Sequence, residues 1–259
     1  GPVYQTIEGD VQLRGLAYGG NATFGGYNAS IKETGDIGWL AGAAFQIPDI
    51  ALKASVTYRS EIEHSVNVKE SFNSAGLLAG LNAAPSLNTD ITTPQSVNLD
   101  FQTGIMANTV AFANVRWVDW SSFSIQPYKF GLASKSAAIQ AQTGKSEFDL
   151  VAYTDDQISA TVGVGRKLND QWAGNVSVGW DSGAGNPVTT LGPTEGYWNV
   201  GLGAQFSPTP QTFIAGGVKY FWLGDAKAQA ASQFDTANYV ADFESNYAIA
   251  YGLKLGYRF

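Results

Sequence analysis

The sequence predicts an all-β protein, folded as a transmembrane, antiparallel, up-and-down β-barrel. Three observations lead to this prediction. Large apolar residues alternate with small or polar ones over long segments, short and long connections alternate between these segments, and the composition favours strands. We expect a single domain over residues 1–259 with about ten strands.

The composition suits strands and turns better than helices. The 259 residues include 30 Gly, 12 Tyr, 14 Phe and 7 Trp, whereas only 14% are charged. The net charge of −7 leaves no broad cationic surface for a phosphate backbone, which argues against nucleic acid as a partner. The longest small and apolar run, Trp39 to Phe45, is shorter than the roughly 18 residues of a membrane-spanning helix.

The segment at the end of the chain alternates most regularly. From Tyr247 to Phe259 every second residue is large and apolar, and the residues between them are small or polar. This is the side-chain period of a strand, sustained for about twice the usual length of ~5–6 residues. The other expected strands are 3–17, 37–47, 52–59, 97–105, 109–124, 158–165, 172–180, 198–206 and 214–222.

The connections between these segments alternate in length. Short turns are expected at 48–49, 107–108, 167–171 and 207–211. Long polar loops are expected at 18–34, 68–92, 122–148, 182–195 and 224–244. Short turns at one end and long loops at the other are typical of outer-membrane barrels, whose strands are apolar outward and polar or small inward.

A soluble antiparallel sandwich or lipocalin-like barrel is the alternative, because its strands alternate as well. Its polar face contacts water and is rich in Lys and Glu, whereas the corresponding face here is mostly Gly, Ala, Ser and Asn. We favour the membrane barrel, because lipid solvates only apolar side chains and a closed barrel leaves no backbone edge unpaired in hydrocarbon.

Several segments are similar to one known family. They are Leu52–Glu63, Thr93–Gly104, Trp117–Phe123, Gly196–Phe206 and Tyr251–Phe259. Over nearly its whole length, the chain resembles the C-terminal part of the FadL-type outer-membrane transporters, which carry long-chain fatty acids and other hydrophobic compounds. The final aromatic residue, Phe259, resembles the signal read by the barrel-assembly machinery.

The resemblance implies passive transport of hydrophobic molecules without a chemical step, with long-chain fatty acids or hydrocarbons as substrates. It also implies a barrel of roughly fourteen strands plugged by an N-terminal hatch. The ten strands expected here would be the later part of that barrel, without the hatch and the first strands; a self-contained ten-stranded barrel is the alternative. The expected partners are these substrates, outer-membrane lipids and the assembly machinery, with the C-terminus in the periplasm. The alternative function is a small barrel acting as a receptor, an adhesin or a structural protein.

The expected loop at 68–92 contains the candidate capture site. Its apolar residues Phe72, Leu77, Leu78 and Leu81 are unexpected in a polar extracellular segment. They would form a groove that captures amphipathic substrates, as the resemblance implies. The alternative is a short helix that packs on the neighbouring loop at 18–34.

The inward face of the barrel contains the second candidate site. Arg59 is expected there together with Glu61 and Glu63, and Arg116 is expected there beside Phe112. A cation in the lumen would hold a fatty-acid carboxylate through charge-assisted hydrogen bonds. The alternative is that both arginines form ion pairs with Glu61, Glu63 or Asp119 that stabilise the wall.

The residue inventory argues against an enzyme and against a cofactor. There is no Cys, and His64 is the only His. His64 and Ser65 are adjacent on a strand and point to opposite faces, so they do not form a Ser-His pair. We therefore expect no catalytic residues, no metal site and no cofactor.

Overall fold

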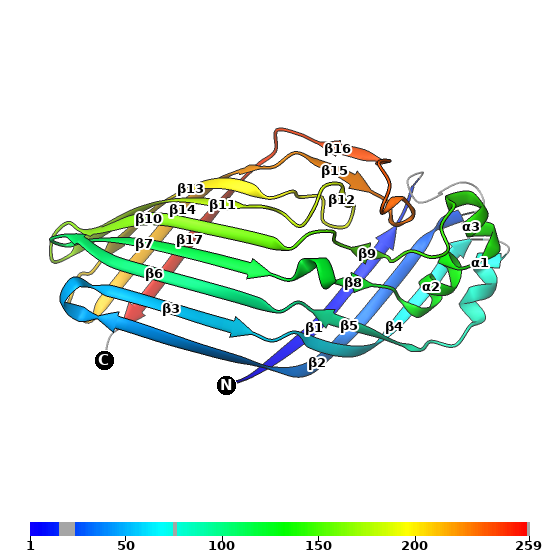
Figure 1. Cartoon of the computed structure of the whole chain (residues 1–259), viewed down its shortest axis with the longest axis horizontal. Coiled ribbons are helices and arrows are strands. Elements are labelled where there is room, and N and C mark those ends of the chain that lie inside the picture. Colours follow the sequence, from blue (N-terminus) through cyan, green and yellow to red (C-terminus); the bar gives the residue numbers. More distant parts are fainter. Residues whose placement is uncertain (16–23, 75–76, 258–259) are drawn as a thin grey trace.

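A computed structural model describes residues 1–15, 24–74 and 77–257, and its main feature is one antiparallel sheet of twelve strands (Figure 1). Neighbouring strands follow one another along the chain, so the predicted all-β, up-and-down topology is confirmed. The strands are β1 (Pro2–Leu13), β2 (Phe24–Ile47), β3 (Leu52–Arg59), β4 (Ile62–Ser74), β5 (Asn88–Thr93), β6 (Ser96–Met106), β7 (Thr109–Val118), β10 (Gln157–Lys167), β11 (Trp172–Asp181), β13 (Tyr197–Phe206), β14 (Thr212–Leu223) and β17 (Tyr247–Tyr257).

Two of the twelve strands continue the strand before them. β4 follows β3 after a break at Ser60 and Glu61, and both pair with β2. β6 follows β5 after a break at Pro94 and Gln95, and they pair with β3 and β4. Counting each kinked pair once, the twelve strands make ten spans, which agrees with the predicted ten.

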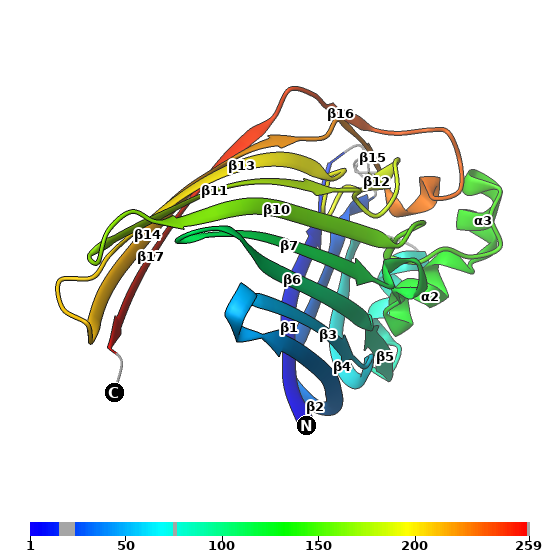
Figure 2. The ribbon, with the colours of Figure 1, turned by 60° about the vertical axis from the view of Figure 1, so that its left-hand side comes forward.

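The sheet curls but does not close within the described residues. Its order runs from β17 through β14, β13, β11, β10, β7, β6 and β3 to β2, and β1 lies beyond β2. No described pairing joins β1 to β17, and Figure 2 shows the two strands as separate edges of the curved wall. The sheet is therefore an open part of a barrel. Phe259, expected to be part of the assembly signal, lies outside the described residues.

Short turns join the strands at one end of the sheet, which we call the short-turn end. They lie at 48–51, 107–108, 168–171 and 207–211, as predicted. At the opposite, long-loop end, the connections contain helices and small sheets, and none of the described helices is long and apolar enough to cross a membrane. The elements of this end are α1 (Leu77–Gly80), α2 (Tyr128–Ser134), α3 (Ala137–Thr143), β8 (Ser124–Ile125), β9 (Val151–Ala152), β12 (Val188–Thr189), β15 (Ala226–Gln229) and β16 (Ala241–Phe243).

Two predicted loops contain parts of strands of the twelve-stranded sheet. The expected loop at 18–34 includes the start of β2 at Phe24, and the expected loop at 68–92 includes the end of β4 at Ser74 and most of β5. The prediction was wrong there because strands that extend beyond a membrane face water, so their outer faces are polar like a loop. Residues 16–23 of the first loop lie outside the described structure.

In most spans, the convex outer face is apolar and the concave inner face is small or polar. Ile37, Tyr251 and Leu253 on the outer face are 73%, 80% and 75% exposed, as expected for residues that contact lipid. Near the long-loop end, Trp180 pairs with Trp198, Trp198 with Trp222, and Trp222 with Tyr247. This row of aromatic residues is typical of the interfacial girdle of a membrane barrel.

In β4 the inner face is apolar and the outer face is polar, which is the reverse of most other spans. Ile62, Val66 and Val68 are at most 4% exposed and face inward, whereas Glu61 and Glu63 are exposed on the outer face. The prediction that Glu61 and Glu63 face inward with Arg59 was therefore wrong, because the break between β3 and β4 shifts the alternation by one residue. β4 behaves as a strand of a water-soluble protein, with an apolar core inside and water outside.

Candidate transport path

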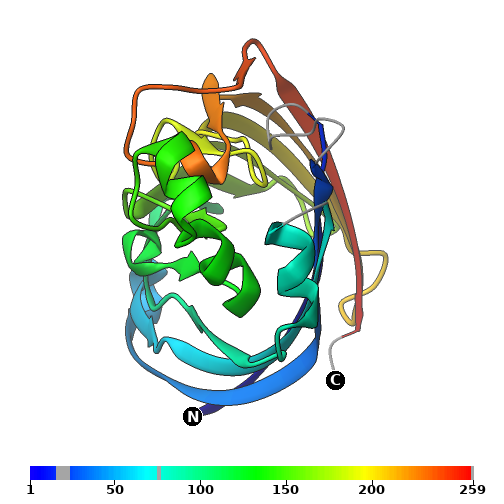
Figure 3. The ribbon, with the colours of Figure 1, turned by 90° about the vertical axis from the view of Figure 1, so that its right-hand side faces the viewer.

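An apolar cluster fills the inner side of the long-loop end. Tyr27 of β2 lies with its ring centroid 5.0 Å from that of Phe72 on β4 and 5.3 Å from that of Phe130 on α2. Further buried members from distant parts of the chain are Leu13, Ala29, Val66, Val68, Ile91, Ala133, Leu150, Val151 and Ala231. Figure 3 looks at this end, where the helical segments lie across the opening of the curved sheet.

The carboxylate of Glu70 attaches α2 to the wall of the barrel. Glu70 faces inward and is only 8% exposed. It accepts hydrogen bonds from the Tyr27 hydroxyl and from the backbone N–H groups of Lys129 and Phe130, all at 2.8 Å. A buried carboxylate with three donors is well satisfied, and two of these donors are the free N–H groups at the start of α2.

The amide of Asn82 attaches the segment that follows α1. Its Nδ2 donates to the carbonyl of Phe72 at 2.9 Å, and its Oδ1 accepts from the Phe72 N–H at 2.8 Å. The side chain thus forms with Phe72 the two backbone hydrogen bonds that a neighbouring strand would otherwise form. The buried Lys129 donates from Nζ to the Asn82 carbonyl at 3.1 Å, which links this segment to α2.

The structure therefore brings the predicted capture residues together with this cluster. Phe72 is buried in it, and Leu78 and Leu81 are partly buried against it. The side chain of Leu77, in the short helix α1, lies outside what the structure describes. The residues on which the capture prediction rests form part of a packed core beneath the helices.

Below this cluster, the backbone pairing of β2 with β4 is interrupted, and we call this interruption the slit. The pairing of these spans stops at Ile31 and Val68 and resumes where the Ser60 N–H donates to the Trp39 carbonyl. His64 of β4 is fully buried beside the slit, with Nε2 3.2 Å from Gln5 Oε1 and Nδ1 3.7 Å from an Asp36 carboxylate oxygen. His64 is thus a buried residue of a strand.

Arg59 and Arg116 lie on the inner face below the slit. Arg59 pairs with Ser96 of β6, and Arg116 pairs with Asn98, two residues further along the same strand. Arg116 donates to Asn98 Oδ1 at 3.1 Å, and neither arginine forms an ion pair with a described carboxylate. The ion-pair network that was the alternative reading is absent from this part of the chain.

Phe112 narrows the inner face, above a hollow toward the short-turn end. Its ring lies over Gly163 of the next strand, where an added Cβ would overlap the ring. The hollow beyond it has a volume of about 810 Å³. Its larger lining residues include Phe112, Asn175, Gln205, Arg166, Lys167 and Lys254. A hydrophobic molecule with one polar group would find both apolar surface and cations here.

A group of carboxylates lies at the rim of the long-loop end. Burial, together with the nearby carboxylates of Asp155 and Asp181, raises the pKa of Glu195 from 4.5 to about 7. Glu195, Glu70 and Asn82 were not predicted from the sequence. For Glu70 a signal exists, because it falls in the apolar phase of the alternation from Ile62 to Phe72.

Comparison with known proteins agrees with this architecture. Residues 15–259 match the model of a family described as outer membrane protein transport protein (OMPP1/FadL/TodX). The fold is similar to that of a Pseudomonas aeruginosa FadL homologue, with a TM-score of 0.57 and 16% identity over 88% of this chain and 55% of the other. No curated protein sequence matches the chain.

Two further solved structures have a similar fold. One is the CymD monoaromatic hydrocarbon channel, with a TM-score of 0.53 and 12% identity over 86% of this chain and 63% of the other. The second is the Pseudomonas putida toluene transporter TodX, with a TM-score of 0.51 and 12% identity over 85% and 57%. The chain thus spans between half and two thirds of the length of these proteins.

Proposed function

Because the chain belongs to the OMPP1/FadL/TodX family of outer membrane transport proteins, we propose that it carries hydrophobic molecules passively across the outer membrane. Long-chain fatty acids are the substrates that the inner face favours. The long-loop end would face the exterior and the C-terminus the periplasm. The concentration gradient would supply the driving force, and no chemical step is involved.

The observation that supports this substrate class is the order of surfaces along the inner face. The apolar cluster with Phe72, Leu78 and Leu81 would take up the hydrocarbon part after partitioning from water. Arg59 and Arg116, which form no ion pair with a described residue, would then hold the carboxylate by charge-assisted hydrogen bonds. Phe112 would contact the chain as it passes toward the hollow.

Exit from the path has two candidate places. The slit between β2 and β4 would release a substrate sideways into the membrane, since the backbone of the two strands is not paired there. The hollow at the short-turn end would release it along the axis. The slit lies closer to the apolar cluster, which favours sideways release for a substrate without a charged group.

Hydrocarbons without an acid group are the second candidate class. Two proteins of similar fold are named as a monoaromatic hydrocarbon channel and a toluene transporter. For such substrates the apolar cluster and Phe112 would be sufficient, and the arginines would play no part in recognition.

Binding of a long-chain fatty acid and of the matching alcohol separates these classes. We expect Arg59→Gln and Arg116→Gln each to weaken binding of the acid by roughly tenfold or more, because a hydrogen bond to a charged group contributes ~1.5–3 kcal/mol. The alcohol should bind almost unchanged. Titration calorimetry of the native protein in detergent measures both ligands.

Lys69→Gln, which removes an exposed cation on the outer face of β4, is the matched control and should affect neither ligand. Equal losses for acid and alcohol would show that the arginines only support the wall. If the native protein binds neither ligand, the receptor, adhesin or structural alternative gains support instead.

A further inference from the structure

We propose that the outer face of the barrel holds one glycerophospholipid, with an acyl chain in a groove over β7 and its phosphate on Arg166. This site lies on the lipid side of the wall, opposite the proposed transport path. It would fix one lipid molecule at a defined place in the layer around the protein.

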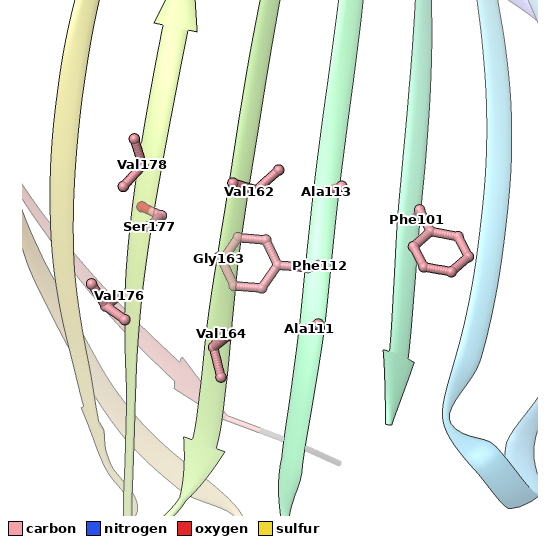
Figure 4. A pocket seen from close by; sticks show the side chains of 10 residues that line it. All are labelled: Phe101, Ala111, Phe112, Ala113, Val162, Gly163, Val164, Val176, Ser177 and Val178. Atoms are coloured by element: carbon pink, nitrogen blue, oxygen red, sulfur yellow. The ribbon is translucent and has the colours of Figure 1, made fainter. Parts of the chain in front are cut away.

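The groove is hollowed in the outer face and has a volume of about 510 Å³ (Figure 4). Its floor consists of Ala111 and Ala113 on β7. Ala113 lies between Phe101 of β6 and Val162 of β10, and Ala111 pairs with Val164. Two consecutive outward positions are thus small, while larger side chains rise on both sides.

The walls of the groove face the hydrocarbon of the membrane. Phe101 is 45% and Val162 57% exposed, as expected for residues whose neighbours are lipid chains. The lining side chains are almost entirely apolar, so an acyl chain would gain contacts on three sides there. On a flat part of the wall it has protein on one side only, and the extra contacts favour the groove.

The distance from Arg166 to the far end of the groove is close to the thickness of one leaflet. From Thr109, the partner of Arg166, to Ala113 at the far end of the groove, β7 advances four residues, or roughly 13 Å at ~3.3 Å per residue. One leaflet of hydrocarbon is about 15 Å thick, half of the ~30 Å core. The groove begins near the short-turn end, so an acyl chain from the leaflet at that end fits along it.

Arg166 supplies the charge at the headgroup end. It pairs with Thr109, two residues before the groove begins at Ala111, and it follows Val164 by two residues, so it projects from the same outer face. It is exposed, and within the described residues it forms no hydrogen bond or ion pair. Gly174 lies opposite it on β11 and leaves space beside the guanidinium.

These features select a phosphate as the group that Arg166 binds. A guanidinium is planar, always charged and suited to bidentate contact with phosphate oxygens. At the end of a strand it reaches the interface, where phospholipid phosphates lie, while the acyl chain below them enters the groove. The charge of Arg166 and the apolar lining of the groove therefore complement the two parts of a single phospholipid.

The test uses the native protein in phosphatidylglycerol vesicles that contain a photoactivatable phosphatidylglycerol with the reactive group on its acyl chain. Peptide mapping then shows which strands are labelled. We expect labelling of β6, β7 and β10 to exceed that of other outer strands. The double variant Ala111→Phe with Ala113→Phe fills the groove and should reduce this labelling about tenfold, which corresponds to ~1.4 kcal/mol.

Ala204→Phe, which enlarges a small outward residue on β13, is the control for size and should leave labelling of β7 unchanged. Arg166→Gln should reduce the labelling in the same way as the filled groove, whereas Lys69→Gln should not. If the double variant fails to fold, Ala111→Val fills part of the groove with a smaller change. Uniform labelling of all outer strands, or unchanged labelling in the filled groove, would overturn the proposal and indicate ordinary surrounding lipid only.

Discussion

Polar residues on the inner face of β4 decide how the long-loop end is held together. Glu70 and His64 occupy positions where the alternation of β4 calls for apolar residues, and both are buried. Glu70 is fully satisfied by its three donors, whereas His64 Nδ1 has no hydrogen bond among the described groups. Single residues thus connect segments that are 59 and 60 positions apart in the chain.

Glu70→Gln is expected to loosen α2. The three partners of Glu70 are all donors, and an amide has only one acceptor oxygen, so at least one buried donor loses its acceptor. This costs about 1–3 kcal/mol. Hydrogen exchange of the amides of 128–134 should accelerate accordingly. Glu63→Gln on the exposed outer face of β4 is the control; equal exchange in the two variants would mean that Glu70 does not hold α2.

The raised pKa of Glu195 predicts a dependence of stability on pH. Between 4.5 and about 7 the folded protein binds this proton more tightly than the unfolded chain does. The stabilisation that protonated Glu195 contributes is therefore fully present at low pH, and it is lost as pH rises through that window. We expect Glu195→Gln to remove the corresponding decrease in the temperature of unfolding, and the exposed-loop variant Glu244→Gln to retain it. A decrease that persists in Glu195→Gln would assign the effect to other groups.

At the scale of single residues, the sequence predicts positions better than partners. It placed Arg59, Arg116 and Phe112 on the inner face, where the structure has them, because the alternation is regular in their strands. It gave no way to see that Glu70 and α2 meet, since that contact depends on how a long connection folds back onto the wall.

At the scale of elements, the main feature is the exchange of faces along β4. Below the break at Ser60 and Glu61, the outer face contacts lipid; above it, the outer face contacts water. The same shift occurs between β5 and β6 at Pro94 and Gln95, where Thr89 and Ile91 face inward before the break and Asn98 after it. The alternation was predicted from sequence, but the shift was not, because it requires knowing where the membrane ends.

Lysine substitutions on the outer face test this boundary. Val162→Lys puts a charge in hydrocarbon and should lower the free energy of unfolding by ~2–4 kcal/mol. Ser65→Lys lies on the outer face of β4 above the break and should cost little, since that face contacts water. Denaturant unfolding of the protein in lipid vesicles measures both. Equal costs would show that the outer face of β4 also lies in the membrane.

At the scale of the whole molecule, the sequence predicted ten spans, their order and the difference between the two ends. These follow from a period of two and from the lengths of the connections, both visible in the printed residues. The apolar core inside the long-loop end was not predicted. Its members come from five or more separate segments, and they meet only because the sheet curls and the long connections fold inward.

The breaks in neighbouring spans also limit which deletions this chain can tolerate during evolution. β2 carries one extra residue relative to β1 between the partners of Ile7 and Gly9, and the β3 and β4 span shifts by one residue as well. The two shifts compensate each other. Leu40 pairs with Arg59, and Ile31 pairs with Val68, so the same nine positions separate the two pairs on each strand. A one-residue deletion in a single span would turn its apolar face toward water. Such deletions should therefore be inherited only together with a matching deletion in the neighbouring span.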